Sequence, residues 1–488
     1  MKTISGETIY ADELHKLPHR LLDLGLPLSD VEPRLVDTAG YPDGKWVALS
    51  HCWGIPENHP LKTTRDTLND RMRGIPLSSM PKTFVHAVKV TKAPGLRYLW
   101  IDSLCIVQND ENEWLAESQD MGTIYERAVL TLAASSAVDS TLGLFLQRDY
   151  SRIHTPSTQL SFLEKDSASG DELLGDYHIG IEWRQEPFMK ALDPMDTTLS
   201  TRGWATQEWI LSRRIVHFME NGMAWVCQSR AEDETRFVIV GRGLGLRDWS
   251  NQWGSIIQEH SSRKFTHQTD RLVSLEGLAR KFAKLKPAST FYSFGTWESD
   301  LPEHLLWSPK MLGKMLTNLP SWSWASCPYE LWFRFREVVT GKDCVQFSPA
   351  CEILGLNKTT GRLSVRAQRI EISRYFAKSF DDEESFTPLR ARANHWSGRY
   401  IAALDNDPSG WALFDDGRDF IDSTKPVFFL VIAAVFLYVT PTFEIYGLLV
   451  VKDLSVKDGY VRVGVGAVSD ASWLALHADF PKVDTDII

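Results

Sequence analysis

The stretch that decides the fold is Tyr98-Leu-Trp-Ile-Asp-Ser-Leu-Cys-Ile-Val-Gln108. Its first four residues are apolar and follow Pro94-Gly95, which predicts a short buried strand. Ligands of open parallel sheets bind outside the carboxyl ends of the strands, so polar side chains at this point indicate a site. The structural alternative is that the acid caps the following turn and the thiol is a small core residue. The polar side chains that follow the strand are Asp102, Ser103, Cys105 and Gln108.

The next segment, residues 112–127, has the pattern of a helix with one apolar face. Asn109-Asp110 is a start signal, and Glu113 lies three residues after Asp110, as in a capping box. Glu117 lies within the apolar stripe, where burial raises the pKa of a carboxyl group. It is therefore the strongest candidate for a general acid or base. The alternative is a structural glutamate bonded to an arginine or to backbone amides.

Composition bounds the class of protein. The chain has 488 residues, 43% of them hydrophobic and 24% charged, which is typical of a globular protein with two or three domains. A net charge of −10, with no basic run, argues against nucleic acid as a partner. The six cysteines show no metal-ligand spacing, so we expect free thiols, no disulfide and no metal.

Neither a signal peptide nor a membrane span is expected. The N-terminal residues are polar and acidic. The most apolar run, residues 427–439, is too short to cross a bilayer and is typical of a buried strand. We therefore expect a cytoplasmic protein.

Alternating patterns predict an α/β fold with a parallel sheet. Strands are expected at 46–50, 98–101 and 128–133, and helices at 81–92 and 112–127. A second dense block begins at Thr201 and predicts a helix carrying Trp204, Glu208 and Leu211 on one face, followed by a strand at 214–218. The Gly241-Arg-Gly-Leu-Gly245 motif lacks the third glycine of a dinucleotide fingerprint, so it does not indicate nucleotide binding.

The chain divides into four predicted parts. An irregular entry segment covers residues 1–44, and the α/β domain covers 45–230, with an acidic surface excursion at 164–176. A mainly helical region at 231–319 precedes a β-rich domain at 320–488.

Several blocks resemble the heterokaryon incompatibility (HET) domain of filamentous fungi. They are Ala48-Leu-Ser-His-Cys-Trp-Gly54, the stretch from Tyr98 to Gln108, Glu117-Ser-Gln-Asp-Met121 and the stretch from Arg202 to Glu208. Two further blocks resemble longer fungal proteins with this domain: Ser261-Ser-Arg-Lys-Phe-Thr266 with Asp270-Arg-Leu272, and Pro320-Ser-Trp-Ser-Trp-Ala-Ser326.

The resemblance implies an effector of fungal non-self recognition that triggers cell death when unlike hyphae fuse. It also implies a fold similar to Toll/interleukin-receptor domains, some of which hydrolyse NAD with a glutamate beside the sheet edge. NAD is then a candidate substrate, and no cofactor is required. The candidate catalytic residues are Glu117, Asp102 and Cys105. The candidate substrate-binding residues are Ser50, Cys52, Trp53, Gln108, Arg202, Trp204, Gln207 and Glu208.

Two other functions remain open. The chain could be a small-molecule enzyme of fungal secondary metabolism built on the same scaffold, in which the many tryptophans close a pocket. It could also be a non-catalytic signalling module that binds a protein partner or forms a homo-oligomer.

Overall fold

A computed structural model gives the structure of the chain. It divides into two compact units, Met1–Asp248 and Trp249–Ile488, each described by itself. The four-part division predicted from the sequence is finer and stays a prediction. The described residues are 14–26, 29, 31–147, 157–165, 172–180, 193–220, 222–227, 230–233, 253–311, 313–333, 345–372, 375–378, 401–404, 407–415, 426–437, 442–456, 459–468 and 479–488. The Gly241–Gly245 motif and part of the 164–176 excursion lie outside them.

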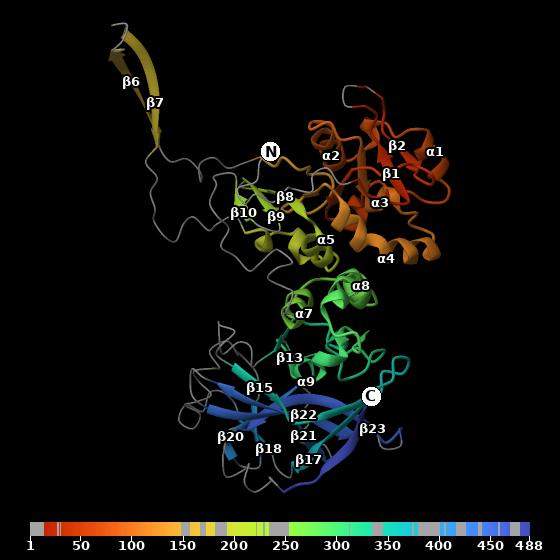
Figure 1. Ribbon diagram of the computed structural model, residues 1–488, viewed down its shortest axis with the longest axis vertical. Helices are drawn as coiled ribbons and strands as arrows, with labels where there is room; N and C mark the ends of the chain where they lie inside the picture. Colours follow the sequence, from red (N-terminus) through yellow and green to blue (C-terminus); the bar gives the residue numbers. More distant parts are fainter. Residues whose placement is uncertain are drawn as a thin grey trace. The chain divides into compact units, whose positions relative to one another are not determined.

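The first unit is built on an eight-stranded sheet in the order β10-β9-β8-β5-β3-β4-β1-β2 (Figure 1). The four central strands are parallel, and the two strands at each edge are antiparallel. This confirms the predicted parallel sheet. Its strands are β1 (Arg20–Asp23), β2 (Arg34–Asp37), β3 (Trp46–Ser50), β4 (Tyr98–Ile101), β5 (Leu130–Ala133), β8 (Arg214–Met219), β9 (Gly222–Cys227) and β10 (Arg230–Asp233).

Helices lie on both faces of this sheet, with α2 on one side and α4 and α5 on the other (Figure 1). The start signal before α4 is confirmed, because the Asp110 carboxylate accepts a hydrogen bond from the Glu113 backbone N–H at 3.2 Å. The unit contains α1 (Leu68–Arg73), α2 (Lys82–Lys92), α3 (Asp102–Cys105), α4 (Glu111–Arg127) and α5 (Ala205–Leu211), and the 3-10 turns η1 (Pro56–Asn58), η2 (Leu77–Ser79), η4 (Pro194–Asp196) and η5 (Leu199–Thr201).

The strand order places a topological switch point beside β3. The chain passes from β3 to β4 on one side and then returns to β5 on the other side of β3. Two crossovers that leave in opposite directions open a crevice at the carboxyl ends of the strands, which is where doubly wound sheets bind ligands. The order therefore draws attention to the ends of β3 and β5. The likeness to Toll/interleukin-receptor domains stays a prediction.

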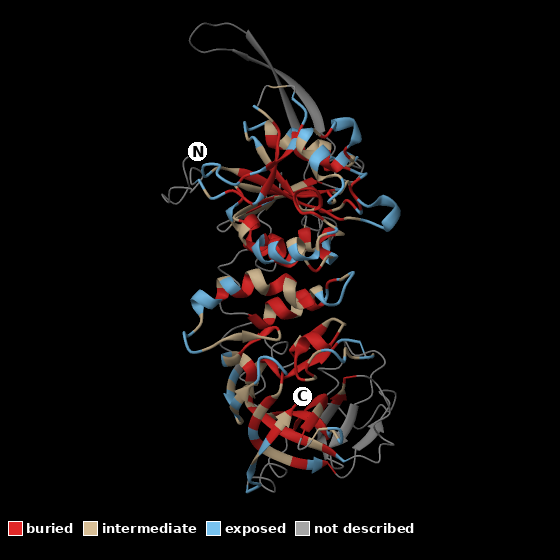
Figure 2. Ribbon diagram, turned by 90° about the vertical axis from the view of Figure 1, so that its right-hand side faces the viewer, coloured by how far each residue is buried: buried red, intermediate tan, exposed pale blue. Residues whose placement is uncertain are grey.

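Large aromatic side chains fill the core around this sheet. Trp46, Phe84 and Trp100 are among the largest fully buried side chains, and the central strands are buried along their length (Figure 2). The Trp46 indole also donates to the Ile124 backbone oxygen at 3.2 Å, which fixes α4 against β3. Burying each of these side chains away from water stabilises the fold by about 2–3 kcal/mol.

One expectation about the first unit is wrong. Residues 1–44 are not irregular throughout, because β1 and β2 extend the sheet next to β4. These four-residue strands show no clear alternation and escaped the pattern. Around residues 164–176, the strands β6 (Ser157–Lys165) and β7 (Glu172–Gly180) pair as an antiparallel hairpin, and the surface excursion stays a prediction.

The second unit begins with helices and tryptophan-rich turns. The helical prediction holds for α7 (Trp253–Ser261), α8 (Asp270–Phe282) and α9 (Leu301–His304). Short strand pairs lie between and after them: β11 (Tyr292–Ser293) with β12 (Thr296–Trp297), and β13 (Trp307–Pro309) with β14 (Leu331–Phe333). The remaining turns are η6 (Ala283–Leu285), η7 (Glu298–Asp300) and η8 (Trp324–Ser326).

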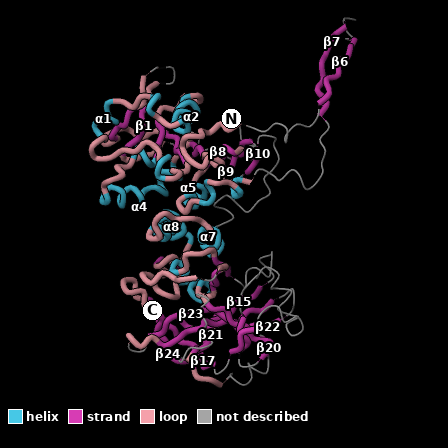
Figure 3. The backbone as a smooth tube through the Cα atoms, turned by 180° about the vertical axis from the view of Figure 1, so that it is seen from behind, coloured by secondary structure: helices cyan, strands magenta, loops and turns pink. Residues whose placement is uncertain are grey.

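A ten-stranded sheet forms the rest of the second unit and confirms the β-rich C-terminal region (Figure 3). The apolar run at 427–439 forms β21, as the sequence predicts, and no helix in the described ranges is long and apolar enough to cross a membrane. The strands are β15 (Val345–Pro349), β16 (Glu352–Leu356), β17 (Leu363–Ile372), β18 (Tyr375–Lys378), β19 (Ile401–Leu404), β20 (Asp407–Phe414), β21 (Val427–Leu437), β22 (Thr442–Lys452), β23 (Gly459–Val468) and β24 (Lys482–Ile487).

Candidate functional site

A buried polar network lies at the carboxyl end of β3. The Ser50 hydroxyl donates to the carboxylate of Glu208, which α5 holds at 1% exposure. The Tyr125 hydroxyl donates to the Leu49 backbone oxygen at 3.1 Å. Burial raises the pKa of Tyr125 well above its usual value, and the neighbouring Glu208 carboxylate raises it further. Tyr125 therefore stays a neutral hydrogen-bond donor.

Arg202 supplies the positive charge of this network. Its guanidinium donates to the His51 backbone oxygen, just past the end of β3. Burial alone would lower the pKa of Arg202. The negative charge of Glu208, with smaller contributions from Cys52 and Asp102, more than offsets this effect, so the pKa is raised overall. The guanidinium is therefore a permanent cation facing the buried carboxylate.

Asp102 follows β4 and anchors a second part of the network. Its carboxylate accepts from the Trp53 indole N–H at 2.9 Å and from the Ser103 backbone N–H at 2.7 Å. The Nδ1 atom of His51 lies 3.7 Å from the same carboxylate. His51 is 1% exposed, and burial lowers its pKa to about 4, so its ring is neutral at pH 7. The amide of Gln108 donates to the Asp102 backbone oxygen at 3.0 Å, so this side chain supports the turn.

The loops after β3 and β5 meet at the switch point. Gly54 has a φ of +78°, and a Cβ added there would lie 2.5 Å from the Cβ of Asp139. The Asp139 carboxylate accepts from the Asn58 side chain at 2.8 Å and from the Thr141 hydroxyl at 2.6 Å. Only glycine allows this approach at this φ, so the sequence at the end of β3 fixes how the two loops pack.

Glu117 lies elsewhere along the same edge of the sheet. Its carboxylate is 2.9 Å from the Nδ1 atom of His19, which precedes β1. Because β1 runs antiparallel to β4, the start of β1 lies at the carboxyl end of β4. Burial raises the pKa of Glu117, and the hydrogen bond with His19 opposes this. The Glu117 side chain is 10% exposed and that of His19 is 46% exposed, so this carboxyl group lies close to solvent.

Arg20 and Glu113 complete the surroundings of Glu117. The guanidinium of Arg20 pairs with the Glu113 carboxylate, which also accepts from the Val107 backbone N–H at 2.7 Å. Arg20 also donates from Nε to the Cys105 backbone oxygen at 3.0 Å. The Glu113 carboxylate is thus bonded to Arg20 and Val107, whereas the Glu117 carboxylate faces the half-exposed ring of His19.

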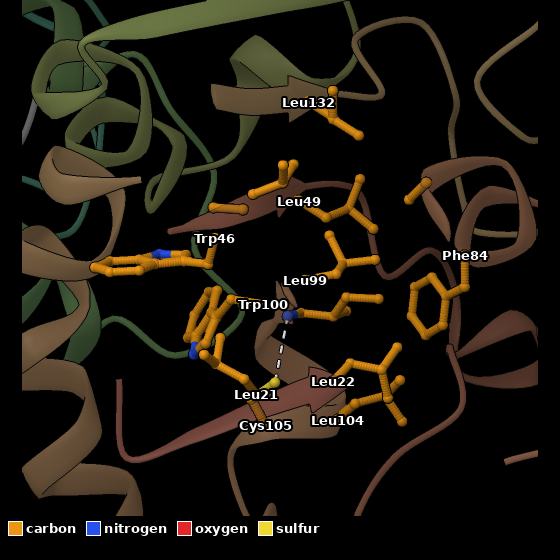
Figure 4. Close-up of a cluster of buried hydrophobic side chains, with 14 of the residues drawn as sticks. Leu21, Leu22, Trp46, Leu49, Phe84, Leu99, Trp100, Leu104, Cys105 and Leu132 are labelled. Atoms are coloured by element: carbon orange, nitrogen blue, oxygen red, sulfur yellow. Dashed lines mark hydrogen bonds between the residues drawn. The ribbon is translucent and has the colours of Figure 1, made fainter. Parts of the chain in front are cut away.

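Cys105 lies in the hydrophobic core of the first unit. It is 1% exposed among apolar side chains, and its sulfur accepts from the Ile101 backbone N–H at 3.5 Å (Figure 4). Burial raises its pKa to about 12, which disfavours the thiolate that acts as a nucleophile. This environment favours the structural alternative for Cys105, and its catalytic role stays a prediction.

The residues around the candidate site therefore separate into two groups, each with predicted members and further residues that contact them. The first, called here the switch-point group, comprises Ser50, His51, Trp53, Asp102, Tyr125, Arg202 and Glu208. The second, called here the Glu117 group, comprises His19, Arg20, Glu113 and Glu117. Asp102 and Glu117, both candidate catalytic residues, therefore lie in different groups: Glu117 contacts His19, while Asp102 contacts Trp53, Ser103 and His51.

Three predicted binding residues have other surroundings. Cys52 packs in an apolar cluster with Ala133 and Leu199. The Trp204 ring stands edge-on to that of Trp114, with 6.2 Å between centroids. Gln207 is fully buried, and its amide atoms form no hydrogen bond among the described residues.

Five members of these groups are not among the candidate residues from the sequence: His51, Tyr125, His19, Arg20 and Glu113. Tyr125 lies on the buried face of its helix, and a tyrosine at the end of an apolar stripe near strand ends could have signalled a hydrogen bond. His19 and Arg20 carried no local signal, because they reach the site only through the pairing of β1 with β4.

A hollow of about 470 Å³ opens on the first unit, away from both groups. It is lined by apolar residues of the β1–β2 loop and α2, such as Leu24, Pro33 and Val88, with Lys89 and Lys92 at its rim. In the described residues, no group of three or more histidine, cysteine, aspartate or glutamate side chains could hold a metal ion.

Comparison with known families gives one match in the first unit. Residues 46–208 match the family model of the heterokaryon incompatibility protein (HET). The resemblance seen in the sequence is confirmed over these residues. The match runs from the first residue of β3 to Glu208 and so includes the switch-point group and Glu117. No curated protein and no solved structure matches the chain.

Proposed function

We propose that this protein is an effector of heterokaryon incompatibility whose HET domain causes cell death by hydrolysing NAD. The match of residues 46–208 to the HET family carries the first part of the proposal. The environment of Glu117 supports the second part. A cytoplasmic location and a small-molecule or nucleotide ligand are part of the same proposal.

Glu117 has the properties required of a catalytic base. Burial raises its pKa toward neutral pH, where a carboxyl group both accepts and releases a proton efficiently. Its partner His19 is half-exposed, so a ligand that displaces this ring would contact the carboxyl group directly. Arg20 lies close enough to affect the pKa of Glu117 and adds positive charge for an anionic substrate.

The reaction balances without a cofactor. The bond between the ribose carbon and the nicotinamide nitrogen breaks, and its electron pair neutralises the pyridinium nitrogen. Water adds to the ribose carbon and gives its proton to Glu117, which releases ADP-ribose and nicotinamide. Trp53, whose indole is held by Asp102, offers a partly exposed ring on which a base could stack.

The direct test compares NAD consumption by the purified protein and by two variants. We expect the wild-type protein to release nicotinamide, and Glu117→Gln to release it at least about 100-fold more slowly. Glu111→Gln is the matched control, because Glu111 is an exposed residue of the same helix. The control should retain wild-type turnover. Full turnover by Glu117→Gln would refute the catalytic role.

A second readout separates the enzymatic claim from the effector claim. The wild-type chain expressed in a fungal host should arrest growth, and Glu117→Gln should not. If the wild-type chain arrests growth without loss of NAD, NAD hydrolysis is wrong and the effector role stands. If it does not arrest growth at all, the effector role is wrong.

A non-catalytic signalling module is the second candidate function. It is favoured by the switch-point group, in which Glu208 is 1% exposed, bonded to Ser50 and matched by the charge of Arg202. Such a network stabilises a fold and does not need a substrate. A protein that oligomerises or binds a partner, yet turns over no nucleotide, would support it. The secondary-metabolism enzyme stays a prediction from the sequence.

A further inference from the structure

The second unit contains a buried arginine that forms no ion pair with any of the residues that the structure describes. Arg271 is the second residue of α8 and is 1% exposed. Its Nη2 atom is 3.4 Å from the Tyr329 backbone oxygen, while its Nε and Nη1 atoms are buried and donate no hydrogen bond. A guanidinium carries five donors and keeps its charge, so this is an unusual burial.

Aromatic rings, and no carboxylate, surround this guanidinium. Its central carbon lies 5.3 Å from the ring centroid of Trp324 and 5.8 Å from that of Phe265. Among the described residues, no carboxylate is within ion-pair distance of Arg271. Cation–π contacts compensate only part of the cost of removing a charge from water, so an anion bound here would stabilise the buried guanidinium.

Neighbouring side chains increase the positive charge. The Nε2 atom of His260 is 2.9 Å from the Arg271 backbone oxygen. Burial lowers the pKa of His260, and the charges of Arg271 and Arg263 lower it further, so both arginines are close to this ring. The carboxylate of Glu259 lies 3.6 Å from the guanidinium of Arg263.

We propose that Arg271, with Arg263 beside it, forms a binding site for a phosphate group. A phosphate carries up to two negative charges at neutral pH and accepts several hydrogen bonds, which matches a buried guanidinium with unused donors better than a carboxylate does. Nothing in the proposed role of the HET domain requires this site, so it is an additional function of the chain.

The loop between α7 and α8 gives a route to the site. Its residues Ser262, Lys264 and Thr266 are exposed, and Phe265 between them is partly exposed while its ring covers Arg271. The partly exposed ring of Phe265 therefore marks the side from which the guanidinium lies nearest to solvent. The exposed Lys264 next to it would favour the approach of an anion.

The test is thermal unfolding of the full chain, followed by calorimetry, with inorganic phosphate added at constant ionic strength. Phosphate should raise the melting temperature of the wild-type protein, by roughly 5–10 °C at a concentration a hundred times its Kd. Acetate at equal ionic strength should have little effect. Arg271→Met should abolish the response to phosphate.

The matched control is Arg280→Met, an exposed arginine of the same helix, which should respond as the wild-type protein does. If Arg271→Met does not fold, Arg271→Lys serves in its place, since it keeps the charge and loses the guanidinium fork. The lysine variant should need at least about tenfold more phosphate for the same shift. A wild-type protein that ignores phosphate, an equal response to acetate, or an unchanged response in the Arg271 variants would overturn the proposal.

Discussion

The switch-point group of the first unit and the tryptophan-rich turns of the second unit bury polar side chains in different ways. In the switch-point group of the first unit, the carboxylate of Glu208 faces the guanidinium of Arg202, and the Ser50 hydroxyl bridges the carboxylate to the end of β3. In the second unit, tryptophans donate their indole N–H groups to backbone oxygens, as Trp322 does to Gly361 at 2.7 Å and Trp324 does to Gly295 at 2.9 Å. The first arrangement depends on charge and therefore on pH, and the second depends on shape.

The largest expected effect comes from removing the buried carboxylate. Glu208→Ala leaves Arg202 buried without its counter-charge and leaves the Ser50 hydroxyl without its acceptor. We expect a loss of about 3–5 kcal/mol in the stability of the first unit, measured as the shift of its calorimetric transition. Glu220→Gln, an exposed carboxylate of the same unit, should change it by less than about 0.5 kcal/mol. A loss in Glu208→Ala as small as in this control would show that the network contributes little.

The shape-dependent arrangement is tested by adding a methyl group. In Gly295→Ala, the new Cβ would lie 2.5 Å from the indole nitrogen of the fully buried Trp324, at a φ of +85°. Backbone strain and crowding together should cost about 3 kcal/mol. Gly40→Ala is the control, because Gly40 has a φ of +79° and nothing within 4 Å of the added Cβ, so only strain of about 1 kcal/mol remains. Equal losses in the two variants would show that the tryptophan can move.

Acid should affect the first unit through His51. Burial holds the folded-state pKa of this ring at about 4, below its usual value, with Asp102 and Arg202 as the charged groups that face it. The unfolded state therefore binds the proton first, and stability falls as the pH drops from about 6.5 toward 4. In His51→Phe this contribution is absent, so the loss of stability between pH 7 and pH 4.5 should be smaller by about 2–3 kcal/mol.

Neutral pH is the internal control for the same variant. The two ring nitrogens of His51 form no hydrogen bond among the described residues, and the ring contacts Phe84 edge-on at 5.2 Å, so a phenyl ring should replace it at little cost. If the wild-type protein and His51→Phe lose the same stability as the pH falls, His51 is already protonated in the folded state.

The central part of the fold could be predicted because its signals are local. The strands at 46–50 and 98–101 appear at the predicted positions, and the helix from Glu111 to Arg127 begins one residue before the predicted start, since short apolar runs and capping residues act within a few positions. The strands β1 and β2 could not be predicted in the same way, because four-residue segments become strands only by pairing with β4.

The candidate site could be predicted only in part for the same reason. The sequence placed Asp102 just after a strand and Glu208 on a helix, where the structure has them, and it identified Glu117 as a carboxyl group on a buried face. The partners were not predictable, because His19 lies 98 residues from Glu117, and Ser50 lies 158 residues from Glu208. Whether His19 or Ser50 contacts one carboxylate or another depends on how the helices and strands pack against each other.

The smallest expected effect concerns Glu117 and decides how its pairing with His19 is to be understood. Burial raises its folded-state pKa above the usual 4.5, although His19 and Arg20 oppose this and Glu113 adds to it. The folded state then binds the proton first, and the contribution of this group to stability falls as the pH rises through the window between the two pKa values. Glu117→Gln should therefore be more stable relative to the wild-type protein at pH 7.5 than at pH 4.5, by less than about 1 kcal/mol, in matched calorimetric scans. The reverse order would mean that the ion pair with His19 outweighs burial, in which case the carboxylate is held for structure and is poorly suited to accept a proton from water.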